Sequence, residues 1–93
     1  MRRLDLRSRF RADVLRIKRQ RVRIDWETLA YVFDELVAGR SVPNMLIPHS
    51  LDSEWAGFEE FHLEGDLLVI YRLTDNWAEV HRIGTHRELF RTR

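Results

Sequence analysis

The spacing of apolar residues differs between the two halves of this chain. In residues 10–37, apolar side chains recur every three or four residues, and after residue 57 they recur every second residue. The first spacing is typical of a helix with one buried face, and the second is typical of a strand with one buried face. A chain that places its helices first and its strands afterwards is expected to form two separate layers, an α+β arrangement.

Three strands are predicted in the second half of the chain. Their sequences are "GFEEFHL", "LLVIYRL" and "AEVHRIG", and only "EGD" and "TDNW" separate them. Connections this short join antiparallel neighbours, so the three strands should form a meander. The middle segment is nearly all apolar, which indicates a central strand covered on both faces.

The first half predicts a strand and two helices. "RRLDLRS" alternates leucine with charge, as a half-exposed strand does, and two amphipathic segments covering residues 9–22 and 26–39 form an αα-hairpin. Residues 41–56 contain both prolines and have no lasting period, so a loop is expected. The predicted order is β-α-α-β-β-β: an antiparallel sheet packed on an N-terminal helical hairpin, in a single domain of residues 1–93.

Composition narrows the class of protein. The chain has no cysteine and no apolar run near the roughly 18 residues of a membrane helix, so we expect a cytoplasmic protein without membrane contact. Residues 1–40 carry eleven Lys/Arg against six Asp/Glu, residues 41–81 one against eight, and residues 82–93 four against one. Basic ends around an acidic middle indicate either a surface for a polyanion or arginine-rich solvated helix faces.

Several polar residues stand at strand ends and in loops, where functional groups concentrate. Alternation places Glu60 and His62 on one face of their strand, and on the last strand it places Arg82 with Ala78 and Val80. His49 lies in the proline-containing loop, Asp66 opens the central strand, and His86 follows the last strand. Together they make a candidate His/Asp/Arg cluster.

Each of these residues also has an ordinary structural interpretation. A lone histidine is most often a surface residue, which is our interpretation of His81 beside Glu79. Asp66 after Gly65 is common turn chemistry, and Arg82 can pair with a carboxylate of the acidic middle. Four histidines raise the question of zinc, but no spacing here matches a ligand pattern, so we expect neither a metal nor a cofactor.

Residues 49–90, "HSLDSEWAGFEEFHLEGDLLVIYRLTDNWAEVHRIGTHRELF", resemble the toxins of the RelE superfamily, and among them the YafQ branch. The shared pattern begins with a histidine followed by a leucine and then W-x-G. An acidic residue then stands two positions before a histidine, and an aspartate stands four positions after that histidine. The pattern ends with L-x-I-Y-[KR] and R-x-G-[ST]-H-x-x-L-F. Every element is present in order. The basic N-terminal half matches only in its expected architecture, a strand followed by a helical hairpin.

The resemblance implies the toxin of a bacterial type II toxin–antitoxin pair, a ribosome-dependent mRNA endonuclease (mRNA interferase) with a RelE-like fold. Its implied partners are the ribosome, mRNA and a RelB- or DinJ-like antitoxin, which makes a toxin–antitoxin hetero-oligomer. The residues carried over from the pattern as catalytic are His49, His62, Asp66 and His86, and those carried over as substrate- or phosphate-binding are Arg82 and Phe90. His81 matches no position of the family pattern.

The implied chemistry needs these residue types. RNA carries its own nucleophile, the ribose 2′-OH, so the protein must remove that proton, protonate the leaving 5′-oxygen and stabilise charge on phosphorus. Histidine serves either proton transfer because its ordinary pKa lies near 6.5. We expect His86 to be the general acid, Asp66 and His62 to act on the 2′-OH, and His49 to contact phosphate or share the proton work. Gly84 should let the chain leave the last strand sharply, and Thr85 should bond the turn that holds His86.

Two departures from the family pattern keep other functions open. Glu59 stands where the family usually has arginine, and Gly65 and Leu67 replace a proline and a tryptophan. Alternation places Glu59 on the face opposite His62, away from the candidate site. One alternative is a non-catalytic ParE-like inhibitor directed at gyrase, which lacks the histidine cluster, and another is a degenerate domain that only binds an antitoxin.

Overall fold

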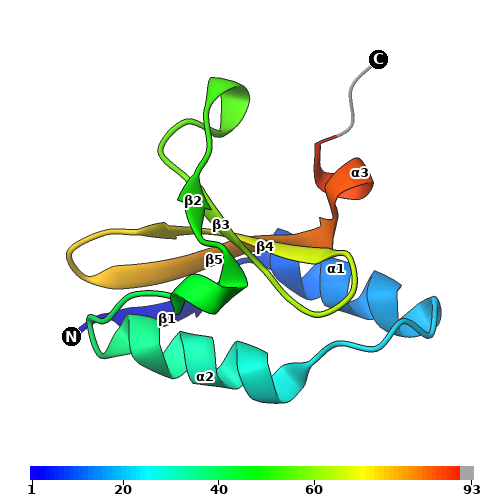
Figure 1. The fold of residues 1–93 in the computed structure, drawn as a ribbon, viewed down its shortest axis with the longest axis horizontal. Coiled ribbons are helices and arrows are strands. Elements are labelled where there is room, and N and C mark those ends of the chain that lie inside the picture. The colour runs from blue at the N-terminus through cyan, green and yellow to red at the C-terminus, as the bar shows by residue number, and fades with distance from the viewer. Residues whose placement is uncertain (91–93) are drawn as a thin grey trace.

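The computed structural model describes residues 1–90, and the last three residues of the predicted domain lie outside the described residues. Five strands form one sheet in the order β1-β5-β4-β3-β2. Their bounds are β1 Arg3–Leu6, β2 His49–Ser50, β3 Glu59–His62, β4 Leu67–Leu73 and β5 Trp77–Thr85. The predicted meander is β3, β4 and β5, and the predicted α+β class is confirmed (Figure 1).

The sheet is not antiparallel throughout. The pairs β2–β3, β3–β4 and β4–β5 are antiparallel, but β1 lies at the edge and runs parallel to β5. The β1 pairing stops at Leu6 opposite Val80, although β5 continues to Thr85. Within residues 1–90, the last part of β5 therefore has no neighbouring strand on that edge.

Two longer helices cover one face of the sheet. They are α1 (Ser8–Arg19) and α2 (Trp26–Val37), and a third short helix, α3 (His86–Leu89), follows β5 directly. Asp25 caps α2 by accepting a hydrogen bond from the Thr28 N–H, and Gly39 ends it with a φ of 87° that favours glycine. The loop before β3 contains two 3-10 turns, η1 (Asn44–Leu46) and η2 (Ser53–Trp55).

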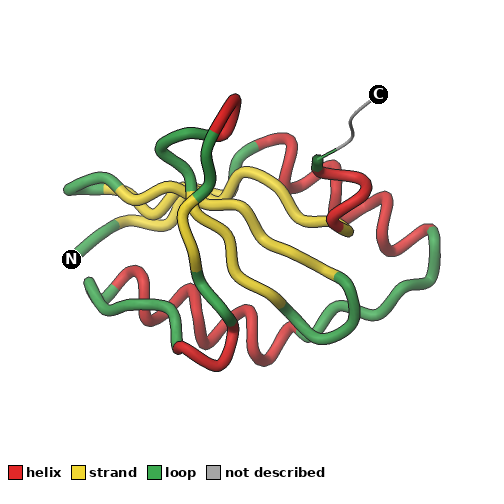
Figure 2. The backbone as a smooth tube through the Cα atoms, turned by 45° about the horizontal axis from the view of Figure 1, so that its top comes forward, coloured by secondary structure: helices red, strands yellow, loops and turns green. Residues whose placement is uncertain are grey.

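Both faces of β4 are buried, as its apolar sequence predicts. The larger core lies between the sheet and the helices and includes Val69 and Tyr71, whereas Leu68 and Ile70 point to the other face. There they pack with a smaller apolar group contributed mainly by the η2 loop and α3: Leu51, Trp55, Phe58, Leu89 and Phe90. Figures 1 and 2 show β2, η2 and α3 rising on the side of the sheet away from α2.

A bulge in β5 overturns the alternation predicted for that strand. Ile70 pairs with Arg82 and Tyr71 pairs with Val80, so His81 is an extra residue without a partner on β4. Val80 and Ile83 are both fully buried in the larger core, and Arg82 lies on the opposite face instead of with Val80. One inserted residue shifts the alternation for the rest of a strand, which is why strict alternation misplaced Arg82.

No helix within residues 1–90 is long and apolar enough to cross a membrane.

Candidate active site

Two histidines meet a buried glutamate on the face of the sheet away from α2. β2 pairs with β3 so that His49 lies opposite Glu60, and His62 follows Glu60 by two residues on the same face. His49 Nε2 is 2.7 Å from Glu60 Oε2, and His62 Nε2 is 3.5 Å from the same oxygen. The side chains of His49 and His62 are 49% and 39% exposed, so both imidazoles are open to solvent while Glu60 is buried beneath them.

His49 is held between two hydrogen-bond acceptors. Its Nδ1 lies 3.3 Å from the Ser50 carbonyl oxygen, and its Nε2 faces the Glu60 carboxylate. The imidazolium form carries an N–H on each ring nitrogen and satisfies both contacts. Both ring nitrogens of His49 therefore lie beside acceptors, while the ring itself stays half exposed to solvent.

Glu60 is only partly satisfied. Its Oε2 faces the two histidines, but its Oε1 is buried and has no hydrogen-bond partner among the described residues. A buried polar atom without a partner costs free energy, on the order of 1–3 kcal/mol. The fold keeps this carboxylate despite that cost, which points to a functional use of the site.

A capping box positions His86 at the start of α3. The Thr85 hydroxyl oxygen accepts a hydrogen bond from the Glu88 N–H at 3.1 Å, and Glu88 Oε1 accepts one from the Thr85 N–H at 3.0 Å. Thr85 thus bonds the turn as the sequence predicts. His86 is exposed, and its ring lies 5.0 Å from the half-buried Phe90 ring.

Gly84 is required for a different reason from the one predicted. Its φ is not in the left-handed region, so the sharp exit from β5 does not depend on glycine flexibility. A Cβ at this position would lie 2.9 Å from Glu88 Oε1 and 3.1 Å from Leu89 Cδ2. The missing side chain is what allows α3 to fold back closely against β5.

One cleft of about 460 Å³ joins these elements. Its lining includes His49 and Glu60 from the sheet, Trp55 from η2, and His86 and Phe90 from α3. His62 lines a neighbouring groove and reaches the cluster through Glu60. Asp66 is exposed in the turn before β4, outside the cleft lining. Because Leu67 pairs with Thr85, however, Asp66 and His86 stand at the same end of the sheet.

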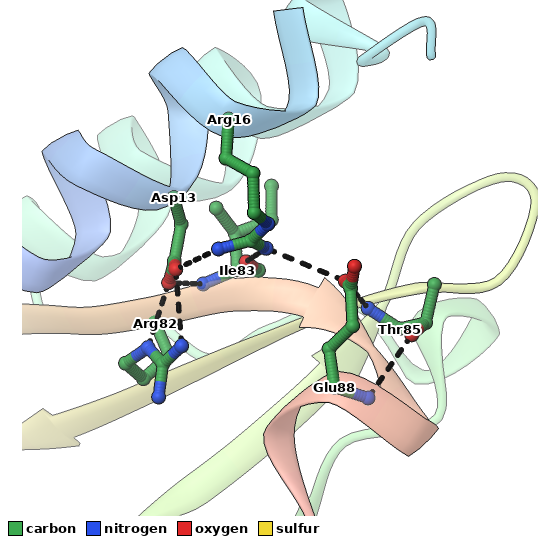
Figure 3. A network of polar contacts seen from close by, with 6 residues as sticks. All are labelled: Asp13, Arg16, Arg82, Ile83, Thr85 and Glu88. Atoms are coloured by element: carbon green, nitrogen blue, oxygen red, sulfur yellow. Dashed lines mark hydrogen bonds and ion pairs between the residues drawn. The ribbon is translucent and has the colours of Figure 1, made fainter. Parts of the chain in front are cut away.

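Arg82 is bound by α1, and its partner is not in the acidic middle of the chain. Its Nε and Nη2 donate to the two carboxylate oxygens of Asp13 at 2.7 and 3.0 Å (Figure 3). Asp13 also accepts hydrogen bonds from Arg16 Nη1 at 2.6 Å and from the Ile83 N–H at 3.0 Å. Arg82 lines a separate hollow with Arg9 and His81, and Trp55 lines both this hollow and the cleft.

The side chains of Asp13 and Arg16 bond the backbone of β5 where no strand lies beside it among the described residues. Past the end of β1, the Ile83 N–H donates to Asp13, and Arg16 Nη2 donates to the Ile83 carbonyl at 3.4 Å and to Glu88 at 3.3 Å. Burial raises the pKa of Asp13, but the hydrogen bonds from Arg82, Arg16 and Ile83 outweigh it and hold that pKa below its ordinary value. α1 thereby fixes the end of β5 and, through Glu88, the base of α3.

His81 and Glu59 lie away from this chemistry. His81 Nε2 is 2.9 Å from Glu79 Oε1, and Arg72 binds the same carboxylate, which agrees with a structural role for His81. Glu59 pairs across the sheet with Tyr71. Burial is the largest cause of the raised pKa of the Tyr71 hydroxyl, and the hydrogen bond to Glu59 is the second cause. The unusual carboxylate at residue 59 therefore faces the helices and leaves the histidine cluster undisturbed.

Two residues central to this region were missed by sequence reasoning. Glu60 shares a predicted face with His62 and is part of the family pattern, but neither observation assigns it a role. Asp13 gave no signal, because an aspartate among arginines on a helix is typical of a solvated surface.

Comparison with solved structures shows the class of this protein: a toxin with the fold of the type II toxin–antitoxin endonucleases. The toxin chain in a crystal structure of the Escherichia coli DinJ-YafQ complex is 31% identical, with a TM-score of 0.80 over 97% of this chain and 99% of that one. A metal-bound toxin from Helicobacter pylori is 26% identical, with a TM-score of 0.82 over 97% of this chain and all of that one.

The family itself follows from the sequence. The family model described as "Bacterial toxin of type II toxin-antitoxin system, YafQ" matches residues 2–91. The mRNA interferase toxin YafQ of Escherichia coli strain B/BL21-DE3 is 36% identical over 67 residues, which cover 71% of this chain and 73% of that protein. This chain belongs to the YafQ family of toxins, and the resemblance read from residues 49–90 is confirmed.

Proposed function

We propose that this chain is an endoribonuclease, the toxin of a type II pair, which cuts mRNA in the ribosomal A site by acid–base chemistry without a metal ion. The observation that carries the proposal is the single cleft lined by His49, Glu60, His86 and Phe90. It combines proton-transfer groups with an aromatic ring on a surface open to solvent. The similar Escherichia coli protein is an mRNA interferase, which supports the same substrate class.

The proposed reaction uses the ribose 2′-OH as nucleophile. A base removes its proton, the 2′-oxygen attacks phosphorus, and the 5′-oxygen leaves with a proton from an acid. We assign the acid to His86, which is exposed at the start of α3 and adjoins the cleft. His62 and Asp66 are assigned to the 2′-OH side, and His49, paired with Glu60, to the phosphate.

Glu60 acts as a positioning residue in this mechanism. One oxygen contacts the Nε2 atoms of both His49 and His62, so it restricts the orientation of both rings. Phe90 offers a face on which a base can stack, since single-stranded RNA is commonly held in this way. Arg82 uses two of its five N–H donors on Asp13, which leaves three for a phosphate oxygen.

The proposed partner is a DinJ-like antitoxin, because the structurally similar YafQ chain was solved in complex with DinJ. A groove of about 720 Å³ between α2 and η1 is lined by Tyr31, Met45 and Ile47, each more than half exposed. We assign antitoxin contact to this apolar groove. Replacing Tyr31 with alanine should weaken antitoxin binding without slowing cleavage, and unchanged binding would place the interface elsewhere.

Mapping the 5′ ends of cellular mRNA after expression of the chain tests the proposed activity. The expected result is new ends at positions in frame within codons, and their absence for the His86→Ala variant. A His81→Gln variant serves as the matched control and should cut like the unmodified chain. Intact message at normal levels of folded protein would contradict the proposal.

Ribosome dependence needs a second measurement with purified components. Cleavage of a defined message is expected when it is bound to ribosomes with an empty A site. The same message free in solution should be cut far more slowly. Equal rates for the two would overturn the ribosome-dependent part.

A further inference from the structure

The short helix α3 depends on few contacts for its position. It has four residues, of which only Leu89 is buried. A helix of about one turn has no stability of its own, so contacts with the rest of the chain must hold it. His86, its first residue, is exposed, and its ring lies 5.0 Å from that of Phe90 at the end of the same helix. The orientation of α3 therefore decides where the His86 imidazole points.

Glu88 joins α3 to α1. Its Oε1 accepts hydrogen bonds from the Thr85 N–H at 3.0 Å and from Arg16 Nη2 at 3.3 Å, so one oxygen serves both the capping box and an ion pair (Figure 3). The Arg16 guanidinium is itself fixed, because Nη1 donates to Asp13 at 2.6 Å and Nη2 also donates to the Ile83 carbonyl at 3.4 Å. The start of α3 is thereby bonded to a group that α1 and β5 hold in place.

The Arg16–Glu88 contact needs the space that Gly84 leaves. A Cβ on Gly84 would lie 2.9 Å from Glu88 Oε1 and 3.2 Å from Arg16 Nη2. The Arg16 and Glu88 side chains are 35% and 32% exposed, and a partly exposed ion pair contributes little to stability. A displacement of about 1 Å, by contrast, can cost a catalytic group roughly a hundredfold in rate. We therefore expect this contact to matter more for cleavage than for folding.

We propose that Arg16 is a positioning residue for His86. Through Glu88, it holds α3 in the orientation from which His86 protonates the leaving 5′-oxygen. The inference rests on the proposed function, in which His86 is the general acid. Loss of either side chain of the pair should slow the protonation step and leave binding of the ribosome-bound message unchanged.

A message with sulfur in place of the scissile 5′-oxygen separates this role from a general effect on structure. In the ordinary reaction, the 2′-oxygen bonds to phosphorus, the bond between phosphorus and the 5′-oxygen breaks, and that oxygen takes a proton from the acid. A thiol is far more acidic than an alcohol, so a 5′-sulfur leaves as the thiolate with the bonding electron pair and needs no proton. A defect confined to the acid step should therefore disappear with the sulfur-containing message.

Single-turnover cleavage of both messages on ribosomes gives the rates to compare. On the ordinary message, Arg16→Met and Glu88→Ala should each lower the maximal rate at least about tenfold, without changing the protein concentration that gives half of it. The double variant should be no slower than the slower single variant, because the two residues act through one contact. On the sulfur-containing message, these variants and His86→Ala should all cut at nearly the unmodified rate.

Arg40→Met is the matched control. Arg40 also pairs with a glutamate, Glu35, but at the C-terminal end of α2, and neither residue lines the cleft. This variant should cut both messages at the unmodified rate. Glu88→Ala keeps the test decisive if Arg16→Met fails to fold, because it leaves all four hydrogen bonds to Asp13 in place.

The two messages distinguish failure of this inference from failure of the proposed function. If His86→Ala recovers on the sulfur-containing message and the Arg16 and Glu88 variants do not, the positioning role is wrong and the proposed function stands. Unslowed cleavage of the ordinary message by both variants would also overturn the positioning role. If His86→Ala does not recover, the acid is misassigned and the inference fails with it. Folded, unmodified protein that cuts neither message would contradict the nuclease function itself.

Discussion

Two buried carboxylates, Asp13 and Glu60, differ in how completely their oxygens are hydrogen-bonded. Asp13 accepts four hydrogen bonds from Arg82, Arg16 and Ile83. Glu60 faces two exposed histidines with one oxygen and leaves the other without a partner among the described residues.

The difference separates a structural group from a functional one. Around Asp13, the donors Arg82 and Ile83 hold α1 to the end of β5, and Arg16 donates from within α1, so the network contributes to folding and has no free acceptor. Around Glu60, the partners are two histidines, the residue type best suited to proton transfer near neutral pH. The saturated network around Asp13 agrees with a structural role, and the incomplete one around Glu60 supports the role in the site that we propose for it.

Replacing Asp13 with asparagine should have the largest effect on stability. The variant leaves two arginines beside an uncharged amide, and breaking a buried ion pair typically costs about 3–5 kcal/mol. Urea denaturation should show the free energy of unfolding lowered by an amount in this range. A loss below about 1 kcal/mol would contradict the structural role of Asp13 and end the contrast with Glu60.

Acid should weaken the same network by a smaller amount, because a protonated carboxyl still accepts hydrogen bonds. The pKa of Asp13 is lower in the folded chain than its ordinary 3.8, so its contribution is fully present above that value. It is lost as the pH falls through the folded-state pKa. Denaturation below pH 4 should show a steeper loss of stability for the unmodified chain than for Asp13→Asn, and parallel curves would contradict this account.

A side chain at Gly84 should disturb both regions at once. An added Cβ would lie within 3.2 Å of Glu88, Leu89 and Arg16, and overpacking costs about 1–3 kcal/mol. Because α3 carries His86, Gly84→Ala should also slow cleavage in protein that remains folded. Gly65→Ala separates crowding from backbone strain. A Cβ at residue 65 would meet open space, so only its φ of 78° strains alanine there. If Gly84→Ala keeps normal stability and cleavage, the close packing of α3 is unimportant.

The smallest change in stability is expected for Glu60→Gln. The amide removes a buried charge that is only partly paired, so the free energy of unfolding should stay within about 1 kcal/mol of the unmodified chain. Thermal or urea denaturation compared with Asp13→Asn measures the contrast directly. A loss as large as that of Asp13→Asn would show that Glu60 is a structural residue too.

Periodicity and turn chemistry predicted most of the fold, because the spacing of apolar residues shows which face of each helix or strand is buried. The helical hairpin, the meander and the central position of β4 all follow from it. It could not predict the parallel pairing of β1 or the bulge at His81, since both depend on contacts between distant segments. The Asp13–Arg82 pair joins residues 69 positions apart, and many carboxylates were equally available by sequence.

The candidate site was predicted mainly through the family pattern. That pattern selected His49, His62 and His86, and the structure shows His49 and His62 meeting at Glu60. The role of Glu60 emerged only from its burial and its missing partner. Asp66 and Arg82 remain predictions, because their part in the reaction depends on where RNA lies.

The cleavage rate of ribosome-bound message by Glu60→Gln tests the central claim most directly. At equal concentrations of folded, metal-free protein, the rate should fall by roughly a hundredfold or more if Glu60 positions the proton-transferring histidines, as expected when general acid–base catalysis is lost. The His81→Gln variant should cut at the unmodified rate. A Glu60→Gln protein that cuts as fast as the unmodified chain would contradict the assignment of this cluster as the catalytic site.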